Sequence, residues 1–292
     1  MNKIGIIGVP LKHGQSVDGV QLAPDAFRKS ELIDLLIEKK IKVKDFGNII
    51  FNEEENTQNL KLKNLNLISE VNLNLKNKVN LCLEEKYFPI IIGGDHSLGI
   101  GSIAAISLKY DNLGVIWYDA HTDINTEDTT PSGNIHGMSL ACLLGLGHKS
   151  LTDIVSPKLK HENIVIIGAR SIDEGEILLL KKLNIKVFNM DDIKMSGIDK
   201  VMDEAISYLK ERTKYIHLSF DLDSLDPVYC PGVGLQVEDG ISINDTLIAF
   251  NKLKESNMLV GMDVVEYNPL CDINNITLNN AIKMITEMFN KN

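Results

Sequence analysis

Short apolar runs alternate with helical patterns along almost the whole chain, and this alternation constrains the fold most strongly. Strands are predicted at residues 4–9, 88–92, 114–118, 164–168, 185–188, 216–220 and 259–264. Apolar side chains recur at helical spacing in segments 24–39, 65–83, 97–109, 137–146, 174–183, 200–212, 244–256 and 277–289. Apolar strands between helices are typical of parallel sheets covered on both faces. The pattern therefore predicts an α/β fold with a largely parallel sheet and helices on both sides.

Residues 51–80 are rich in Asn, Leu, Lys and Glu. Because leucines continue into 65–83, we interpret this segment as a solvated loop followed by a helix, not as a linker. There is no internal repeat and no clear boundary, so we expect one domain over residues 1–292.

Composition narrows the class of protein. The hydrophobic fraction of 44% is typical of a globular chain with a sizeable core. The formal net charge of −10 argues against a nucleic acid or an anionic membrane as partner. No apolar run is long enough to span a bilayer, and the start resembles a strand and not a signal peptide, so we expect a cytoplasmic location. The four cysteines form no CxxC pair and are expected to be free thiols: Cys82, Cys142, Cys230 and Cys271.

Unusual polar residues follow four of the predicted strands. The sequence reads GGDHS at 93–97, DAHTD at 119–123 and DLDSLDP at 221–227, and the last strand leads into EYNP at 266–269. Because ligands bind beyond the carboxyl ends of parallel strands, we expect these segments to face one region.

Four carboxylates gathered in one cleft need compensation. Asp119, Asp123, Asp221 and Asp223 would repel one another and lose hydration. Two divalent cations would balance these charges and accept the imidazoles of His96 and His121. Carboxylates with some imidazole suit Mn²⁺ or Mg²⁺-like ions, and paired ions of this kind are a recognised hydrolytic arrangement.

Each motif alone also fits an ordinary polar loop or tight turn. A further alternative is a dinucleotide site, because Gly99-x-Gly101-x-x-Ala104 imitates its fingerprint. Those glycines, however, lie about a helical turn beyond the GGDH turn that ends the strand. Asp119 is also followed by His121 and Asp123, which suit a metal better than a ribose. The joint occurrence of the motifs favours a metal site.

The segments GGDHS, DAHTD and SFDLDSLDP (219–227) resemble the three signatures of the ureohydrolase family, which includes arginases, agmatinases and formiminoglutamases. The resemblance covers nearly the whole chain, from GVPLKHGQ at 8–15 to EYNP. It implies a three-layer αβα sandwich, a binuclear Mn²⁺ site with two ions per subunit, and a homotrimer or homohexamer.

The resemblance also implies a ligand set. One ion would be held by His96, Asp119, Asp123 and Asp221, and the other by His121, Asp119, Asp221 and Asp223, with Asp119 and Asp221 bridging. A metal-bridging hydroxide would attack the guanidinium carbon of the substrate.

Roles beyond metal binding follow from the same resemblance. Glu266 matches the glutamate that pairs with the guanidinium, and His136 matches a histidine that shuttles protons. Together with Asp123, which the resemblance places at the first ion, His136 and Glu266 are the catalytic residues implied.

The loop after DAHTD favours the arginase branch of the family. Its polar residues resemble donors to an α-carboxylate, which agmatine lacks: Asn125, Thr130, Ser132 and Asn134. Asp173 and Glu176 resemble the carboxylates near an α-amine. The implied reaction converts L-arginine and water to L-ornithine and urea.

Two segments depart from the family pattern. Ser171 replaces an aspartate near the α-amine, and Leu235-Gln236 replace a Thr-Pro pair close to the guanidinium end. Asp239 replaces a glycine in the same segment. Two alternatives therefore stay open: a ureohydrolase for agmatine or another guanidino compound, and a metal-binding pseudoenzyme.

Overall fold

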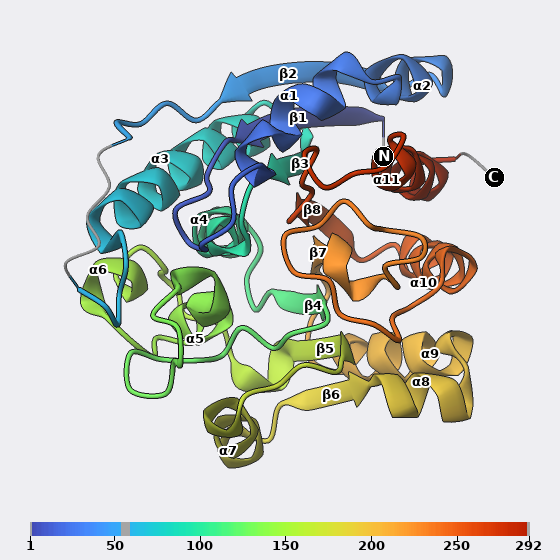
Figure 1. Cartoon of the computed structure of the whole chain (residues 1–292). Coiled ribbons are helices and arrows are strands. Elements are labelled where there is room, and N and C mark those ends of the chain that lie inside the picture. The colour runs from blue at the N-terminus through green and yellow to red at the C-terminus, as the bar shows by residue number, and fades with distance from the viewer. Residues whose placement is uncertain (1, 54–58, 291–292) are drawn as a thin grey trace.

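The computed structural model describes residues 2–53 and 59–290 (Figure 1). Within these residues, eight strands form one sheet in the order β2-β1-β3-β8-β7-β4-β5-β6. Every neighbouring pair is parallel. The strands are β1 (Lys3–Val9), β2 (Lys42–Asn48), β3 (Phe88–Gly93), β4 (Gly114–Tyr118), β5 (Ile164–Ala169), β6 (Lys186–Asn189), β7 (Ile216–Asp221) and β8 (Leu259–Val265).

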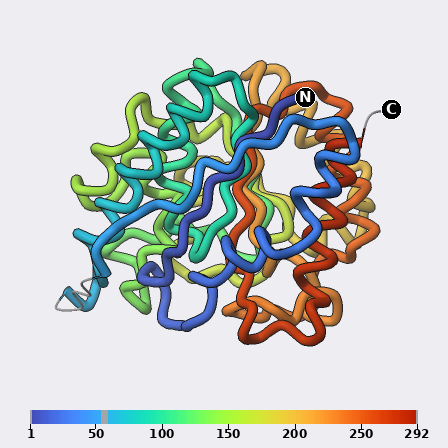
Figure 2. Tube along the Cα trace, turned by 90° about the horizontal axis from the view of Figure 1, so that it is seen from above, coloured from blue at the N-terminus to red at the C-terminus, as the bar shows by residue number. Residues whose placement is uncertain are grey.

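Helices cover both faces of the sheet (Figures 1 and 2). One layer contains α3 (Leu65–Glu84), α4 (Gly99–Lys109), α5 (Ser139–Leu143), α6 (Lys149–Thr152) and α7 (Glu174–Leu183). The other contains α1 (Ala23–Lys29), α2 (Leu32–Glu38), α8 (Met190–Ser196), α9 (Ile198–Lys210), α10 (Ile243–Glu255) and α11 (Ile276–Met288). The predicted α/β class and the three-layer αβα arrangement are confirmed.

The apolar runs form central strands because both faces of the sheet are buried. In β3, Ile90 and Ile92 enter the core beneath α1 and α9–α11, whereas Ile91 enters the core beneath α3 and α4. In β4, Tyr118 and Trp117 divide between the same two cores. Successive side chains of a strand point to opposite faces, so a strand buried on both sides needs no polar position.

Strand β2 was not predicted, because its sequence KVKDFGN lacks an apolar run. It pairs only with β1, at the edge of the sheet, and its side chains are half-buried or exposed. Charged side chains on edge strands are a common protection against pairing with other chains.

The single helix predicted at 24–39 is wrong, because Ser30 divides it into α1 and α2. The backbone at Ser30 is extended, its hydroxyl donates to the Phe27 carbonyl at 2.6 Å, and that hydroxyl accepts a hydrogen bond from the Leu32 N–H at 3.3 Å. A serine can replace a helical backbone bond in this way.

Two further helix predictions need correction. Helix α8 was not expected; it begins at an Asn189–Asp192 capping box and ends at Gly197, where φ is +83°. The helix predicted at 137–146 is a 3-10 turn (Ile135–Met138) followed by the short α5.

The expected helix after the asparagine-rich loop is confirmed as α3, and residues 54–58 of that loop lie outside the described residues. Among the helices described, none is long and apolar enough to cross a membrane. All four cysteines are free thiols, as expected.

The topology explains where a site can form. Strands β3, β8, β7 and β4 are adjacent in the sheet, and they are the four strands followed by the polar segments. The turn after β3 lies against residues 9–11, because the N–H groups of Gly94 and Asp95 donate to the carbonyls of Val9 and Leu11, both at 2.9 Å. A Cβ at Gly94 would collide with the Leu11 carbonyl oxygen.

We predict that Gly94→Ala lowers the free energy of unfolding by about 1–3 kcal/mol, because the added methyl must displace backbone and not a flexible side chain. Urea unfolding of the metal-free protein measures this. Gly137→Ala is the matched control, since a Cβ there meets no described atom within 4 Å. Equal urea midpoints for the two variants would contradict the close approach of the turn after β3 to residues 9–11.

Candidate metal centre

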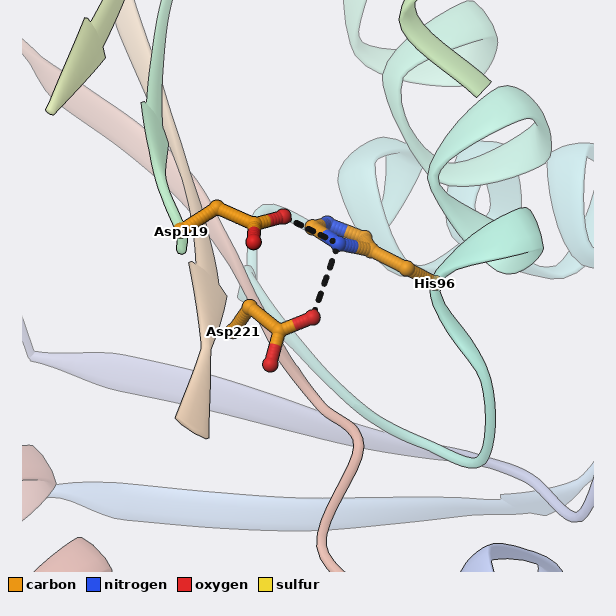
Figure 3. Close-up of side chains that lie close together, drawn as sticks. All are labelled: His96, Asp119 and Asp221. Carbon is orange, nitrogen blue, oxygen red and sulfur yellow. Dashed lines mark ion pairs between the residues drawn. The ribbon is translucent and has the colours of Figure 1, made fainter. Parts of the chain in front are cut away.

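Three carboxylates converge on one nitrogen of His96. Its Nδ1 lies 3.0 Å from Asp119 Oδ2, 3.1 Å from Asp123 Oδ2 and 3.1 Å from Asp221 Oδ2. Figure 3 shows Asp119 and Asp221 reaching this imidazole from the ends of β4 and β7. All four residues are buried.

A second group adjoins the first and shares Asp119. The Nδ1 of His121 lies 3.2 Å from Asp223 Oδ2 and 3.5 Å from Asp119 Oδ1. Asp119 therefore presents one oxygen to each histidine. The ligand atoms of His96, Asp119 and Asp221 lie within 4.8 Å of one another, as do those of Asp119, His121 and Asp223.

The spacing of the motifs has a local structural reason. Asp119 Oδ1 accepts a hydrogen bond from the His121 N–H at 2.7 Å, and Asp221 Oδ1 accepts one from the Asp223 N–H at 2.8 Å. An aspartate that bonds the backbone two residues later forms an Asx turn. These two turns leave both Oδ2 atoms directed at His96 and bring the next ligand of each motif into the site.

The orientation of His96 is fixed from two sides. Its ring stacks on Trp117 with centroids 4.0 Å apart, and Trp117 Nε1 donates to Asp119 Oδ2 at 2.9 Å. On the other edge, His96 Nε2 lies 2.8 Å from Ser219 Oγ, which donates to the buried Asp263 at 3.3 Å. With its hydrogen directed at Asp263, the serine oxygen accepts from His96 Nε2, so Nδ1 is the nitrogen available as a ligand.

The electrostatics show strong competition among these groups. Burial would lower the pKa of His96, but hydrogen bonds to Asp119, Asp123 and Asp221 outweigh it and raise that pKa well above its usual value. Burial and the neighbouring aspartates together raise the pKa of Asp221. The pKa of Asp119 is instead held below its usual range, because hydrogen bonds from His121 and His96 outweigh its burial.

This donor set fits a pair of divalent cations. Four aspartates and two imidazoles lie together, and within the described residues these imidazoles, not lysines or arginines, are the positive groups within 4.0 Å of the aspartates. Two divalent cations would supply the positive charge that, without them, comes from protons on the imidazoles and aspartates. Oxygen-rich ligation with some imidazole suits Mn²⁺ and Mg²⁺ better than ions that prefer thiolates.

Glu266 and His136 lie beside the first group. Glu266 Oε1 accepts a hydrogen bond from the His96 N–H at 2.9 Å and lies 3.3 Å from His136 Nδ1. Burial opposes protonation of His136, but Glu266 outweighs it and raises the pKa of His136 to about 9. The backbone at Glu266 has φ of +65°, a strained conformation that aims the side chain into the site.

Gln15 is a further residue of the site, and residue-by-residue reasoning did not identify it. Its Nε2 donates to Glu266 Oε2 at 2.8 Å, so both oxygens of this carboxylate are held. Gln15 ends the segment GVPLKHGQ at 8–15, in which no residue carries a chemical signal of its own.

Arg170 was also not identified. Its guanidinium donates to the carbonyls of Asp223, Val237 and Glu238 at 2.8, 2.7 and 3.0 Å. It thereby ties the turn that carries Asp223 to the loop that contains Leu235. The partners of Gln15 and Arg170 lie far away in the sequence, so only the folded chain shows their roles.

The residues expected at the α-carboxylate end form one loop. Thr130 Oγ1 accepts from the Gly133 N–H at 2.9 Å, and Ser132 Oγ accepts from the Asn134 N–H at 3.2 Å. Because both hydroxyls accept these bonds, their own hydrogens can be donated to a ligand. Asn125 Nδ2, in contrast, donates to Asp173 Oδ2 at 2.8 Å.

Glu176 is buried, and its carboxylate accepts two backbone hydrogen bonds. Its Oε1 accepts from the Ile124 N–H at 3.0 Å, and its Oε2 accepts from the Asp173 N–H at 2.9 Å. Burial raises the pKa of Glu176 to about 7. Glu176 therefore holds the loop that follows Asp123, whereas Asp173 is exposed at the start of α7.

The departures from the family pattern fit the backbone. Asp239 has φ of +68°, so it keeps a glycine-like conformation that aspartate tolerates. Gln236 Nε2 donates to the Pro231 carbonyl at 2.7 Å and closes the loop. Leu235 is 45% exposed, and a leucine cannot supply the hydrogen bonds of a threonine hydroxyl. Ser171 is exposed at the end of β5.

Comparisons with known proteins agree with this geometry. The model of the arginase family matches residues 2–290. The chain is 45% identical over 290 residues to the arginase of Bacillus subtilis (strain 168), covering 99% of this chain and 98% of that one. The structure of the Bacillus caldovelox arginase superposes with a TM-score of 0.96 at 41% identity, covering 100% and 99% of the two chains. The Entamoeba histolytica arginase, solved in complex with L-ornithine, gives 0.92 at 34% identity, covering 100% of each chain.

We predict that Asp123→Asn changes stability in opposite directions with and without metal. Burial and Asp119 raise the pKa of Asp123, so its ionised form is disfavoured in the folded, metal-free protein. At pH 7 a neutral amide should therefore raise the free energy of unfolding of the metal-free protein. With saturating Mn²⁺ it should lower that energy relative to wild type, because a ligand is lost.

Urea unfolding with EDTA and with Mn²⁺ measures both values, and Asp153→Asn, at an exposed position, controls for the loss of one charge. A shift in the same direction under both conditions would show that Asp123 does not face a cation.

Proposed function

The chain belongs to the arginase family, and on that premise we propose that it hydrolyses L-arginine to L-ornithine and urea with two Mn²⁺ ions. The observation that carries this proposal is the pair of imidazole–carboxylate groups that share Asp119. Identity above 40% to bacterial arginases over nearly the whole chain supports the reaction.

We infer that both ions occupy the two adjoining groups. The side chains proposed to hold them are His96, Asp119, Asp123, Asp221, His121 and Asp223. When bound, two such ions lower the pKa of water and so supply hydroxide near neutral pH. The chain itself fixes the direction of Asp119 and Asp221 through the two Asx turns, and that of His96 through the stacked Trp117.

Glu266 is proposed to align the guanidinium group. A guanidinium is a poor electrophile, so catalysis depends on holding it close and correctly oriented. Planar pairing with a carboxylate provides this alignment, and here Gln15 and the His96 N–H keep the carboxylate from rotating. His136 is within 3.3 Å of Glu266, where a proton could pass to the departing amine.

The opposite end of the substrate is proposed to meet the loop of residues 125–134. Thr130, Ser132, Asn134 and Asn125 would donate to the α-carboxylate, and Asp173 would meet the α-amine. The exposed position of Asp173 supports this role. Glu176 contributes less directly, by holding the backbone at Ile124 and Asp173.

Two alternatives are distinguished by this loop and by Leu235. Donors directed at a carboxylate have no partner on agmatine, which disfavours an agmatinase. A metal-binding pseudoenzyme would follow if Leu235 abolished guanidinium binding.

We also propose, from the family resemblance, that the protein forms a homotrimer or homohexamer in the cytoplasm. Residues 1–292 are proposed to form one domain.

One assay tests the proposal. The Mn²⁺-loaded protein is offered L-arginine, agmatine and other guanidino compounds, and urea is measured. We expect urea chiefly from L-arginine, and Glu266→Gln should lower the rate at least about 100-fold while two metals stay bound. Urea chiefly from agmatine would overturn the carboxylate argument, and no urea from any substrate with two metals bound would favour the pseudoenzyme.

We predict that restoring the family residues near the guanidinium end raises activity. Leu235→Thr together with Gln236→Pro should increase kcat/KM for L-arginine about 5- to 10-fold, in line with one added hydrogen bond of ~1 kcal/mol. Gln236→Pro alone is the control, since it removes the bond to the Pro231 carbonyl and stiffens the backbone without adding a hydroxyl. Unchanged kinetics in the double variant would show that the loop is fully competent as it stands.

A further inference from the structure

A cavity of about 340 Å³ lies beside the proposed substrate site, and Gln15, Ser16 and Lys63 are among the residues that line it. Gln15, on its wall, donates to Glu266 at the guanidinium end. Ser16 and Lys63, also on its wall, contact Asn134 of the α-carboxylate loop. Residues of the cavity wall therefore contact the proposed recognition groups at both ends of the substrate site.

Lys63 is held against the α-carboxylate loop by its backbone and its side chain. Its N–H donates to the Gly133 carbonyl at 3.1 Å, and its Nζ donates to Asn134 Oδ1 at 3.2 Å. Gly133 has φ of +74°, and a Cβ there would collide with the Leu60 carbonyl oxygen. The turn before α3 and the α-carboxylate loop thus approach as closely as a glycine permits.

The charge of Lys63 is not neutralised. In residues 2–53 and 59–290, no carboxylate oxygen lies within 4.0 Å of its Nζ, and its partner is the neutral amide of Asn134. Lys12, the other lysine on the cavity wall, pairs with Asp18 at 2.8 Å. Lys63 is half-buried, so water screens it less than it screens a fully exposed lysine.

We propose that Lys63 determines specificity by binding the α-carboxylate of the substrate, an inference that rests on the proposed function. The hydroxyls and amides of the α-carboxylate loop are neutral donors, whereas hydrogen bonds between two charged groups are roughly twice as strong. A carboxylate that accepts hydrogen bonds from Ser132 and Asn134 would lie within reach of Lys63 Nζ, which is 3.2 Å from Asn134 Oδ1. Agmatine carries no carboxylate, and its net positive charge is repelled by Lys63.

Lys63→Met tests this, because methionine keeps an unbranched side chain and removes the charge. We expect the KM for L-arginine to rise about tenfold with kcat changed less than twofold. The KM for agmatine should stay within twofold or fall. Inhibition should follow the same division: ornithine, which has the carboxylate, should inhibit about tenfold less strongly, and putrescine, which lacks it, should be unaffected.

Lys61→Met is the matched control, since it removes the same charge from an exposed position two residues away. Lys63→Arg should restore most of the affinity for ornithine. Equal rises in KM for both substrates in Lys63→Met, or equal effects of Lys61→Met and Lys63→Met on L-arginine, would overturn the inference. If the wild-type protein releases no urea from L-arginine, the proposed function itself fails.

Discussion

The whole site depends on one electrostatic constraint: four buried aspartates must be compensated at the ends of neighbouring strands. In the structure two imidazoles share this task, and Asp119 serves both of them. Burial and mutual repulsion raise the pKa of Asp123, Asp221 and Asp223, so compensation by further positive charge would favour their ionised forms. Trp117 and Ser219 hold the imidazole of His96 in place between these carboxylates.

The sequence predicted the sheet, and it also predicted that the aspartates and histidines of the candidate metal centre would lie together. Apolar runs mark strands that are buried on both faces, and the charged residues that interrupt this pattern mark their ends. What it could not predict was the order of the strands, which places β8 between β3 and β7 and so brings Glu266 to His96. That order depends on contacts between segments far apart in the chain.

Residues that act through single hydrogen bonds were harder to predict. Gln15 and Ser30 are ordinary polar residues in the sequence, yet one holds Glu266 and the other divides a helix. Glu176 was expected near the α-amine by resemblance, and in the structure its carboxylate bonds to the backbone at Ile124 and Asp173. Strand β2 was missed because an edge strand needs few apolar side chains.

The two ends of the proposed substrate site differ in how firmly they are built. The guanidinium end is buried and held by several hydrogen bonds to Glu266, whereas the α-carboxylate end consists of a loop with half-buried and exposed side chains.

The central claim, that two cations compensate the aspartates, is tested most directly by anomalous diffraction at the manganese edge from crystals grown with Mn²⁺. The account predicts two peaks, one beside His96 and one beside His121. A single peak, or none, with the aspartates protonated or bonded only to the histidines, would contradict it.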